Sequence, residues 1–293
     1  MFKRIALFLA TNLAVMALFS VALSVLQAFG VDLGNNGTLV LFAAIFGFGG
    51  SLFSLMISKW VAKRMTNMRI IETPQNELEQ WLVSIVRRQS EKAGIKMPEV
   101  GMYDAPEINA FATGPSKNNS LVAISTGLAR SMTRDELEAV IGHEVSHIAN
   151  GDMVTMALLQ GVMNTFVIIL SRIVGKIVDT ALFGNRDGHG IGYFAVVFVL
   201  EMVFGLFASM ITAWFSRQRE FRADAGGADL AGRQKMISAL KTLSQNQGVS
   251  QLPNQIAAFG ISGGLKTGFL SLLMTHPPLT KRIEALSNTS VIS

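Results

Sequence analysis

The segment that decides the fold class is Thr133–Gly151, with the sequence TRDELEAVIGHEVSHIANG. Thr133 is followed three residues later by Glu136, which is the pattern of a capping box and predicts the start of a helix. Gly151 can end this helix, because glycine adopts the left-handed backbone conformation at little cost. The sequence therefore predicts one capped helix across this segment.

The middle of the helix carries the motif His143-Glu144-Val145-Ser146-His147. Residues four apart lie on one face of a helix, so both imidazoles can bind one metal ion. Glu144 lies one step around the helix and can accept a proton from a water molecule that the metal activates. A chance occurrence of the motif is the alternative, and its position inside a capped helix disfavours that. The motif predicts metal-assisted hydrolysis of a peptide bond.

A catalytic zinc site usually has a third protein ligand. Glu220 is the candidate, because it stands in Arg219-Glu220-Phe221-Arg222-Ala223-Asp224 directly after an apolar segment. Asp224 shares a helix face with Glu220 and could accept a hydrogen bond from a ligand imidazole. The alternative is a surface helix that binds no metal, and spacing alone leaves both open.

Composition indicates a membrane protein. Half of the residues are apolar and only 15% are charged, against roughly 25% in a soluble domain. The chain has no cysteine, so any metal must be held by His, Asp or Glu. The net charge is +5, but the basic residues flank apolar runs, which favours a lipid bilayer over nucleic acid as partner. No nucleotide-binding fingerprint is present, and the sequence does not predict an oligomeric state.

Four apolar runs are each long enough to cross a hydrocarbon core of about 30 Å as a helix. The basic residues beside the first two runs place the N-terminus and the segment after the second run in the cytoplasm. We expect membrane hairpins over residues 1–58 and 153–216, with residues 172–190 as the outer loop between the last two runs. Buried helices of a soluble protein are the alternative for those two. The runs cover approximately residues 5–31, 38–58, 153–171 and 191–216.

Residues 59–152 and 217–293 have the composition of a soluble domain with helices and strands, and we expect them to form a cytoplasmic catalytic domain. Residues 76–93 read as an amphipathic helix. Asn109, Ala110 and Phe111 begin a strand that could border the site and pair with extended substrate backbone. An ordinary edge strand with Phe111 in the core is an equal alternative. The expected strands cover residues 100–103, 109–113 and 121–125.

Three further positions are candidates for a functional or structural role. His276 precedes Pro277, which disfavours a helix there, and it could approach the metal or donate to an oxyanion. A plain turn histidine is the alternative. Glu201 interrupts the fourth apolar run, so it should face protein or a water-filled cavity. It could line a substrate path, be protonated, or form a hydrogen bond with Gln160 or Asn164. The stretch Gly47-Phe48-Gly49-Gly50 lies in the second run, where close helix packing is favoured over phosphate binding.

Several of these motifs resemble the HtpX membrane proteases, which are relatives of the CAAX prenyl endopeptidases. The resemblance implies a gluzincin site with one Zn²⁺ per chain, bound by His143, His147 and Glu220, with Glu144 as the base. It also implies quality control of membrane proteins. Arg222 stands where some relatives have histidine, which could change the local charge. The segments that carry the resemblance are residues 143–147, 150–152, 219–225, 109–114, 275–278 and 281–286.

The expected architecture is α+β and mainly helical, with a zincin-like catalytic domain on a four-helix transmembrane anchor. We expect an endopeptidase in the bacterial inner membrane whose site faces the cytoplasm and whose substrates are membrane or misfolded polypeptides. One alternative is a transporter with Glu201 as its ion site, although paired broken helices are missing. Another is a membrane scaffold with a structural metal.

Overall fold

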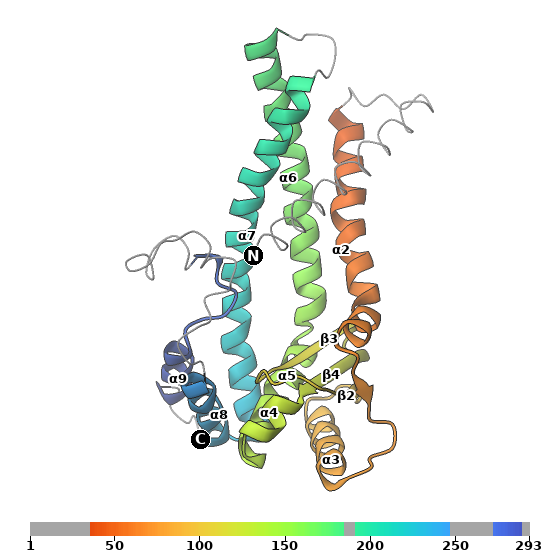
Figure 1. Ribbon diagram of the computed structural model, residues 1–293. Helices are drawn as coiled ribbons and strands as arrows, with labels where there is room; N and C mark the ends of the chain where they lie inside the picture. Colours follow the sequence, from red (N-terminus) through yellow and green to blue (C-terminus); the bar gives the residue numbers. More distant parts are fainter. Residues whose placement is uncertain (1–35, 185–190, 247–271, 289–293) are drawn as a thin grey trace. The chain divides into compact units, whose positions relative to one another are not determined.

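The computed structural model describes residues 36–184, 191–246 and 272–288 (Figure 1). The chain forms two compact units. The first contains residues 36–49 together with Gly161–Ala208, and the second contains Gly50–Gln160, residues 209–246 and residues 272–288. The apolar run expected at residues 5–31 lies outside the described residues.

Within the described ranges, three helices are long and apolar enough to cross a membrane. They are α2 (Asn36–Thr66), α6 (Asp152–Phe183) and α7 (Ile191–Ala231). Each covers one of the expected apolar runs and continues beyond it. Many of their large apolar side chains are exposed, among them Leu41, Phe53, Phe166 and Phe207, which suits contact with lipid.

The first unit differs from expectation at the start of the predicted outer loop. Helix α6 continues through Arg172 to Phe183, so a loop over residues 172–183 was a wrong prediction. Arg172 Nη1 donates a hydrogen bond to Glu201 Oε1 of α7 at 2.9 Å, and arginine is compatible with a helix interior. At Gly175 an added Cβ would lie 2.5 Å from Val197 Cγ2, so the two helices pack closely there. Glu201 thus faces protein.

The glycines of α2 show where this helix is packed tightly. A Cβ added at Gly47 would lie 2.8 Å from the backbone nitrogen of Thr165 on α6, whereas nothing lies within 4 Å of one added at Gly49 or Gly50. Thr165 Oγ1 also donates to the carbonyl oxygen of Ala43 at 3.3 Å. The close helix packing expected over residues 47–50 is therefore present at Gly47 but not at Gly49 or Gly50.

The second unit contains a four-stranded sheet with the order β1-β2-β4-β3. Strands β2 and β4 are parallel, and the other two pairings are antiparallel. Nearly every residue of β4 is buried, which explains its continuous apolar run. Strand β3 lies at one edge and continues past the expected end through an irregularity between Thr113 and Ser116. The strands are β1 (Arg69–Ile70), β2 (Glu99–Tyr103), β3 (Ala110–Ser116) and β4 (Asn119–Ser125).

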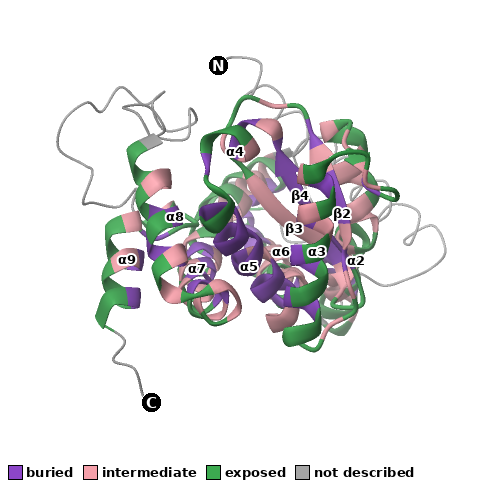
Figure 2. Cartoon of the chain, turned by 90° about the horizontal axis from the view of Figure 1, so that it is seen from below, coloured by how far each residue is buried: buried purple, intermediate pink, exposed green. Residues whose placement is uncertain are grey.

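The central helix of this unit, α5, contacts strands β3 and β4 on one side and helices α3 and α8 elsewhere, and α9 packs on α8. Figure 2 shows α5 largely in the colour of buried residues. Its apolar side chains Leu137, Ile141, Val145 and Ile148 join a core that also contains Leu82 and Ile124. Burial of each such side chain contributes about 1.5–3 kcal/mol. The helices are α3 (Glu77–Lys92), α4 (Thr126–Ser131), α5 (Arg134–Asn150), α8 (Arg233–Asn246) and α9 (Leu279–Asn288).

Candidate metal centre

The helix that carries the histidine motif, α5, begins and ends where the sequence predicts. Thr133 Oγ1 accepts a hydrogen bond from the backbone N–H of Glu136 at 3.3 Å, and Glu136 Oε2 accepts one from the backbone N–H of Thr133 at 3.0 Å. At the other end Gly151 has φ 71° and caps the helix. The capping box and the glycine cap are both confirmed, so the motif lies on a well-defined helix.

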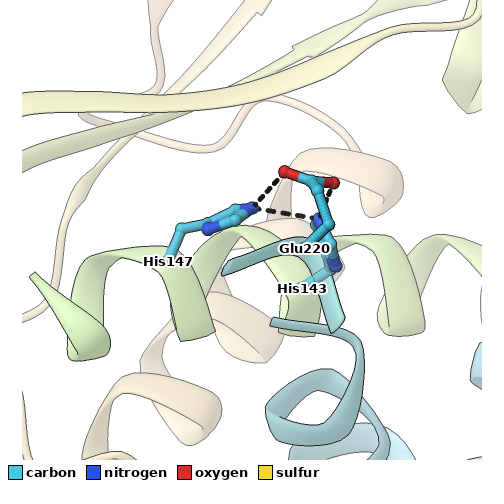
Figure 3. Close-up of side chains that lie close together, drawn as sticks. All are labelled: His143, His147 and Glu220. Atoms are coloured by element: carbon cyan, nitrogen blue, oxygen red, sulfur yellow. Dashed lines mark hydrogen bonds and ion pairs between the residues drawn. The ribbon is translucent and has the colours of Figure 1, made fainter. Parts of the chain in front are cut away.

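Three potential ligands converge from two helices (Figure 3). The Nε2 atoms of His143 and His147 are 3.1 Å apart, and their rings are nearly perpendicular at 86°. From α7, Glu220 Oε2 lies 3.6 Å from His143 Nε2, and Oε1 lies 3.4 Å from His147 Nε2. The three ligand atoms all lie within 4.8 Å of one another, a spacing that could hold one metal ion.

Small residues allow α7 to approach α5 at this point. An added Cβ at Gly227 would lie 3.0 Å from the backbone nitrogen of His143. A Cβ at Gly226 would overlap Ser146 Oγ and lie 2.9 Å from Ser146 Cβ. A larger residue on either side would push the helices apart and move Glu220 away from the histidines.

Each imidazole is held through the nitrogen that points away from the cluster. His147 Nδ1 lies 2.6 Å from Asp152 Oδ2, and His143 Nδ1 lies 3.0 Å from Asp224 Oδ1. A carboxylate that accepts the Nδ1 proton leaves the lone pair of Nε2 free for a metal and fixes the ring orientation. Asp224 was singled out from the sequence for this contact, but Asp152 was not. The sequence feature that could have indicated Asp152 was its position directly after Gly151, where the motif helix ends.

Arg282 of α9 is a further residue of the site for which sequence reasoning predicted no role. Its guanidinium makes two hydrogen bonds to Asp224, with Nε at 2.7 Å from Oδ2 and Nη2 at 2.5 Å from Oδ1. Its Nη1 lies 3.4 Å from Glu220 Oε2. Arg282 is buried, so one positive charge compensates two buried carboxylates. Only the fold reveals this contact, because α9 is distant from α7 in sequence.

The electrostatics of the cluster suit a cation. Glu220 is 1% exposed, and neither carboxylate oxygen receives a hydrogen bond of normal geometry. Burial would raise the pKa of Glu220, but the neighbouring imidazoles hold it well below its usual range. Burial likewise lowers the pKa of His143, yet Asp224 and Glu220 together raise it to about 9. A buried carboxylate with open acceptor sites is costly, and a divalent ion that displaces the imidazole protons would satisfy it.

The structure places the other predicted residues around this cluster. Glu144 is half-buried on α5. Burial raises the pKa of the Tyr103 phenol on β2, and the carboxylates of Glu107 and Glu144 raise it further. His276 Nδ1 lies 3.0 Å from Glu220 Oε2, with 64% of its side chain exposed. Arg222 is exposed on α7.

The residues expected to border the site lie at the start of the edge strand. The backbone N–H of Asn109 donates a hydrogen bond to Ser125 Oγ at 3.1 Å, and the carbonyl oxygen of Asn109 accepts one from the backbone N–H of Ser125 at 3.0 Å. Ala110 and Phe111 are half-buried, and the Phe111 ring lies 5.8 Å from that of Tyr103. Strand β3 contacts α5, so these residues lie in the same part of the unit as the motif.

Comparisons with known proteins agree with this picture. Residues 76–290 match Peptidase family M48. A protein named Protease HtpX from Xanthomonas campestris pv. campestris (strain B100) is 62% identical over 98% of this chain and 97% of its own length. Protease HtpX from Stenotrophomonas maltophilia (strain R551-3) is also 62% identical, over 99% of this chain and its full length. The crystal structure of S. mikatae Ste24p has a similar fold, with a TM-score of 0.66 and 17% identity, and covers 97% of this chain.

The apolar helices and the His-His-Glu cluster define a membrane-associated metalloprotease, mainly helical with a small sheet. The chain belongs to peptidase family M48 and is an HtpX-type member of it, as the sequence motifs indicated. It spans only 64% of the length of the Ste24p chain.

Proposed function

We propose that this metalloprotease is a zinc-dependent endopeptidase that hydrolyses peptide bonds of membrane or misfolded proteins. The observation that supports this best is the convergence of His143 Nε2, His147 Nε2 and the Glu220 carboxylate, with both Nδ1 atoms bonded to carboxylates. Two imidazoles and one carboxylate are a ligand set that suits zinc at a catalytic site with an open position.

Zinc held by His143, His147 and Glu220 would supply Lewis acidity to a water molecule and to the scissile carbonyl. Glu144 is the acidic residue of the motif that is not a proposed metal ligand. It would accept the proton of that water and donate it to the leaving nitrogen. His276 is exposed beside Glu220, and its imidazole would donate a hydrogen bond to the oxygen on which negative charge develops. Asp152 and Asp224 would keep the two ligand rings in place.

The edge strand β3 supports a proposal for how substrate binds. In the described part of the sheet, β3 pairs only with β4, so its outer edge can accept an extended peptide by strand addition. Backbone pairing of this kind gives affinity with little sequence preference. A peptide substrate N-methylated at alternate residues tests it: methylation should raise KM in one register and leave it unchanged in the other. Equal KM in both registers would contradict strand addition.

We further propose the topology that the charge pattern favours. The hairpins of residues 1–58 and 153–216 would anchor the chain in the bacterial inner membrane, and residues 59–152 and 217–293 would form the catalytic domain on the cytoplasmic side. The absence of cysteine makes a direct test simple. A single cysteine at the exposed position of Arg222 should react with an impermeant thiol reagent in inverted vesicles, and labelling in right-side-out vesicles instead would refute this orientation.

The mechanism is tested with purified wild type beside Glu144→Gln, measuring metal content and casein cleavage. The variant should keep one zinc ion per chain and lose at least about 100-fold in cleavage, the usual size of a general-base contribution. Glu91→Gln, which changes an exposed carboxylate of α3, is the matched control and should cleave as wild type does. Full chelator-sensitive cleavage by Glu144→Gln would overturn the assigned role.

A further inference from the structure

One face of α7 is crossed by a segment of the chain that comes from far along the sequence. Arg217, Glu220 and Asp224 are spaced by three and four residues, so they lie on one face of the helix. The crossing segment is Leu272–Arg282, which we call the 272–282 strap. It contacts all three of these residues, and Glu220 lies between the other two along the helix.

The strap is attached to α7 on both sides of the site. Arg217 Nη1 donates hydrogen bonds to the carbonyl oxygens of Leu272 at 3.1 Å and Met274 at 2.6 Å. On the other side, Arg282 is bonded twice to Asp224. Between these attachments, His276 Nδ1 lies 3.0 Å from Glu220 Oε2.

The first attachment matters because the chain just before His276 has little support of its own. Residues 274–278 form neither helix nor strand, and Thr275 and His276 are both exposed. Pro277 and Pro278 restrict the backbone and cannot donate hydrogen bonds. Pro277 is buried and holds the chain after His276. Before His276, the chain is held by the two hydrogen bonds that Arg217 donates to Leu272 and Met274. A charged donor makes such bonds stronger than a neutral one does.

We infer that Arg217 is a positioning residue: it holds the 272–282 strap so that His276 stays beside the ligand Glu220. This inference deepens the proposed function, because it assumes that His276 contributes to peptide hydrolysis. Arg217 itself acts only through the strap, so its effect on catalysis should disappear once His276 is removed.

The kinetic test is a double-mutant cycle on the full-length protein with Arg217→Met, which keeps the length of the side chain and removes its donors. We expect Arg217→Met and His276→Ala each to lower kcat/KM, by up to about 100-fold as for other small misplacements of a reacting group. The double variant should be no worse than His276→Ala alone. Arg217→Lys, which keeps a charged donor, should recover much of the loss. Arg222→Met, an exposed arginine on the same helix, is the control and should match wild type.

A second measurement does not depend on proteolysis. Because the chain has no cysteine, Thr275→Cys gives a single site for a nitroxide spin label on the strap. The electron paramagnetic resonance spectrum should show a more mobile label in Arg217→Met than in the parent, with Arg217→Lys and Arg222→Met close to the parent. This arm gives its answer even if the proposed peptidase mechanism is wrong.

Two results would overturn the inference. One is an unchanged label mobility in Arg217→Met, which would show that the strap does not need this arginine. The other is a double variant whose loss in kcat/KM is the product of the two single losses, since Arg217 would then act independently of His276. A failed Glu144→Gln test with the expected change in mobility would instead reject the proposed mechanism and leave the attachment standing.

Discussion

Asp152, the first residue of α6, accepts a hydrogen bond from Nδ1 of His147, the last residue of the motif, at 2.6 Å. Asp152 is 2% exposed. The start of an apolar helix is thereby tied to a proposed ligand, and the contact sets which nitrogen of His147 points into the cluster.

Replacement of this carboxylate should weaken metal binding. Asp152→Asn keeps the size of the side chain but removes its charge, so the imidazole becomes a weaker ligand, and metal affinity should fall about 10–100-fold. Competition with a chelator of known affinity measures this. Asp229→Asn removes an exposed carboxylate on α7 and should bind metal as wild type does. Equal affinity in Asp152→Asn would show that the contact does not tune the ligand.

The close approach of α5 and α7 predicts a steric effect. Gly226→Ala places a methyl group against Ser146, and overpacking of this kind destabilises by about 1–3 kcal/mol. Because α7 carries Glu220, metal affinity should fall as well. Chemical unfolding and metal titration in detergent measure the two effects. The double variant Gly226→Ala with Ser146→Gly restores room and should recover part of both.

The matched control is Gly205→Ala on the same helix, where an added Cβ meets nothing within 4 Å. It should be neutral or slightly stabilising, because alanine favours a helix by up to about 1 kcal/mol over glycine. If both variants lost stability equally, steric contact with Ser146 would not be the cause.

The N-terminus of α3 predicts an effect of pH on stability. Glu79 is buried and bonded to Arg69, and it accepts the backbone N–H of Gln75 at 2.8 Å. The Arg69 guanidinium and then this backbone bond hold the pKa of Glu79 below its ordinary value of 4.5. The folded protein thus binds this proton less readily than the unfolded chain, so the stabilisation is present above about pH 4.5 and is lost as pH falls through the lower folded pKa.

Glu79→Gln should therefore lower the thermal midpoint in detergent at pH 7, and its difference from wild type should shrink at progressively lower pH. Glu77→Gln alters an exposed neighbour in the first turn of the same helix and should show little difference at any pH. A Glu79→Gln difference that grew on acidification would contradict the direction of the pKa shift.

For the pair Arg172–Glu201 we expect that the stability losses of the two single variants do not add up in the double variant. Loss of one partner removes the opposite charge from the other among apolar helices, which should destabilise by up to about 3–5 kcal/mol. Thus Arg172→Met and Glu201→Leu should each lower stability sharply, and the double variant should recover most of it. Casein cleavage by the double variant should persist, since Glu201 is engaged with Arg172 rather than with the metal centre. Ion flux that depended on Glu201 would favour the transporter alternative.

The sequence by itself determined the features that depend on neighbours within about one helix turn. The capping box at Thr133 and the left-handed Gly151 are both present. The spacing of His143 and His147 places both on one face of α5, because the geometry of a helix is the same in every protein. Apolar length likewise predicted α2, α6 and α7, although each helix continues beyond the expected run.

The tertiary structure alone decided which distant charges meet. Arg282 of α9 meets Asp224 of α7, and Arg172 of α6 meets Glu201 of α7. An isolated stretch of sequence holds no information about such partners, because the energy of a buried charge depends on what surrounds it in space. The same reason explains why spacing alone left two readings of Glu220 open, a metal ligand or a residue of a surface helix. Glu220 lies beside both histidines because α5 and α7 pack closely through their glycines.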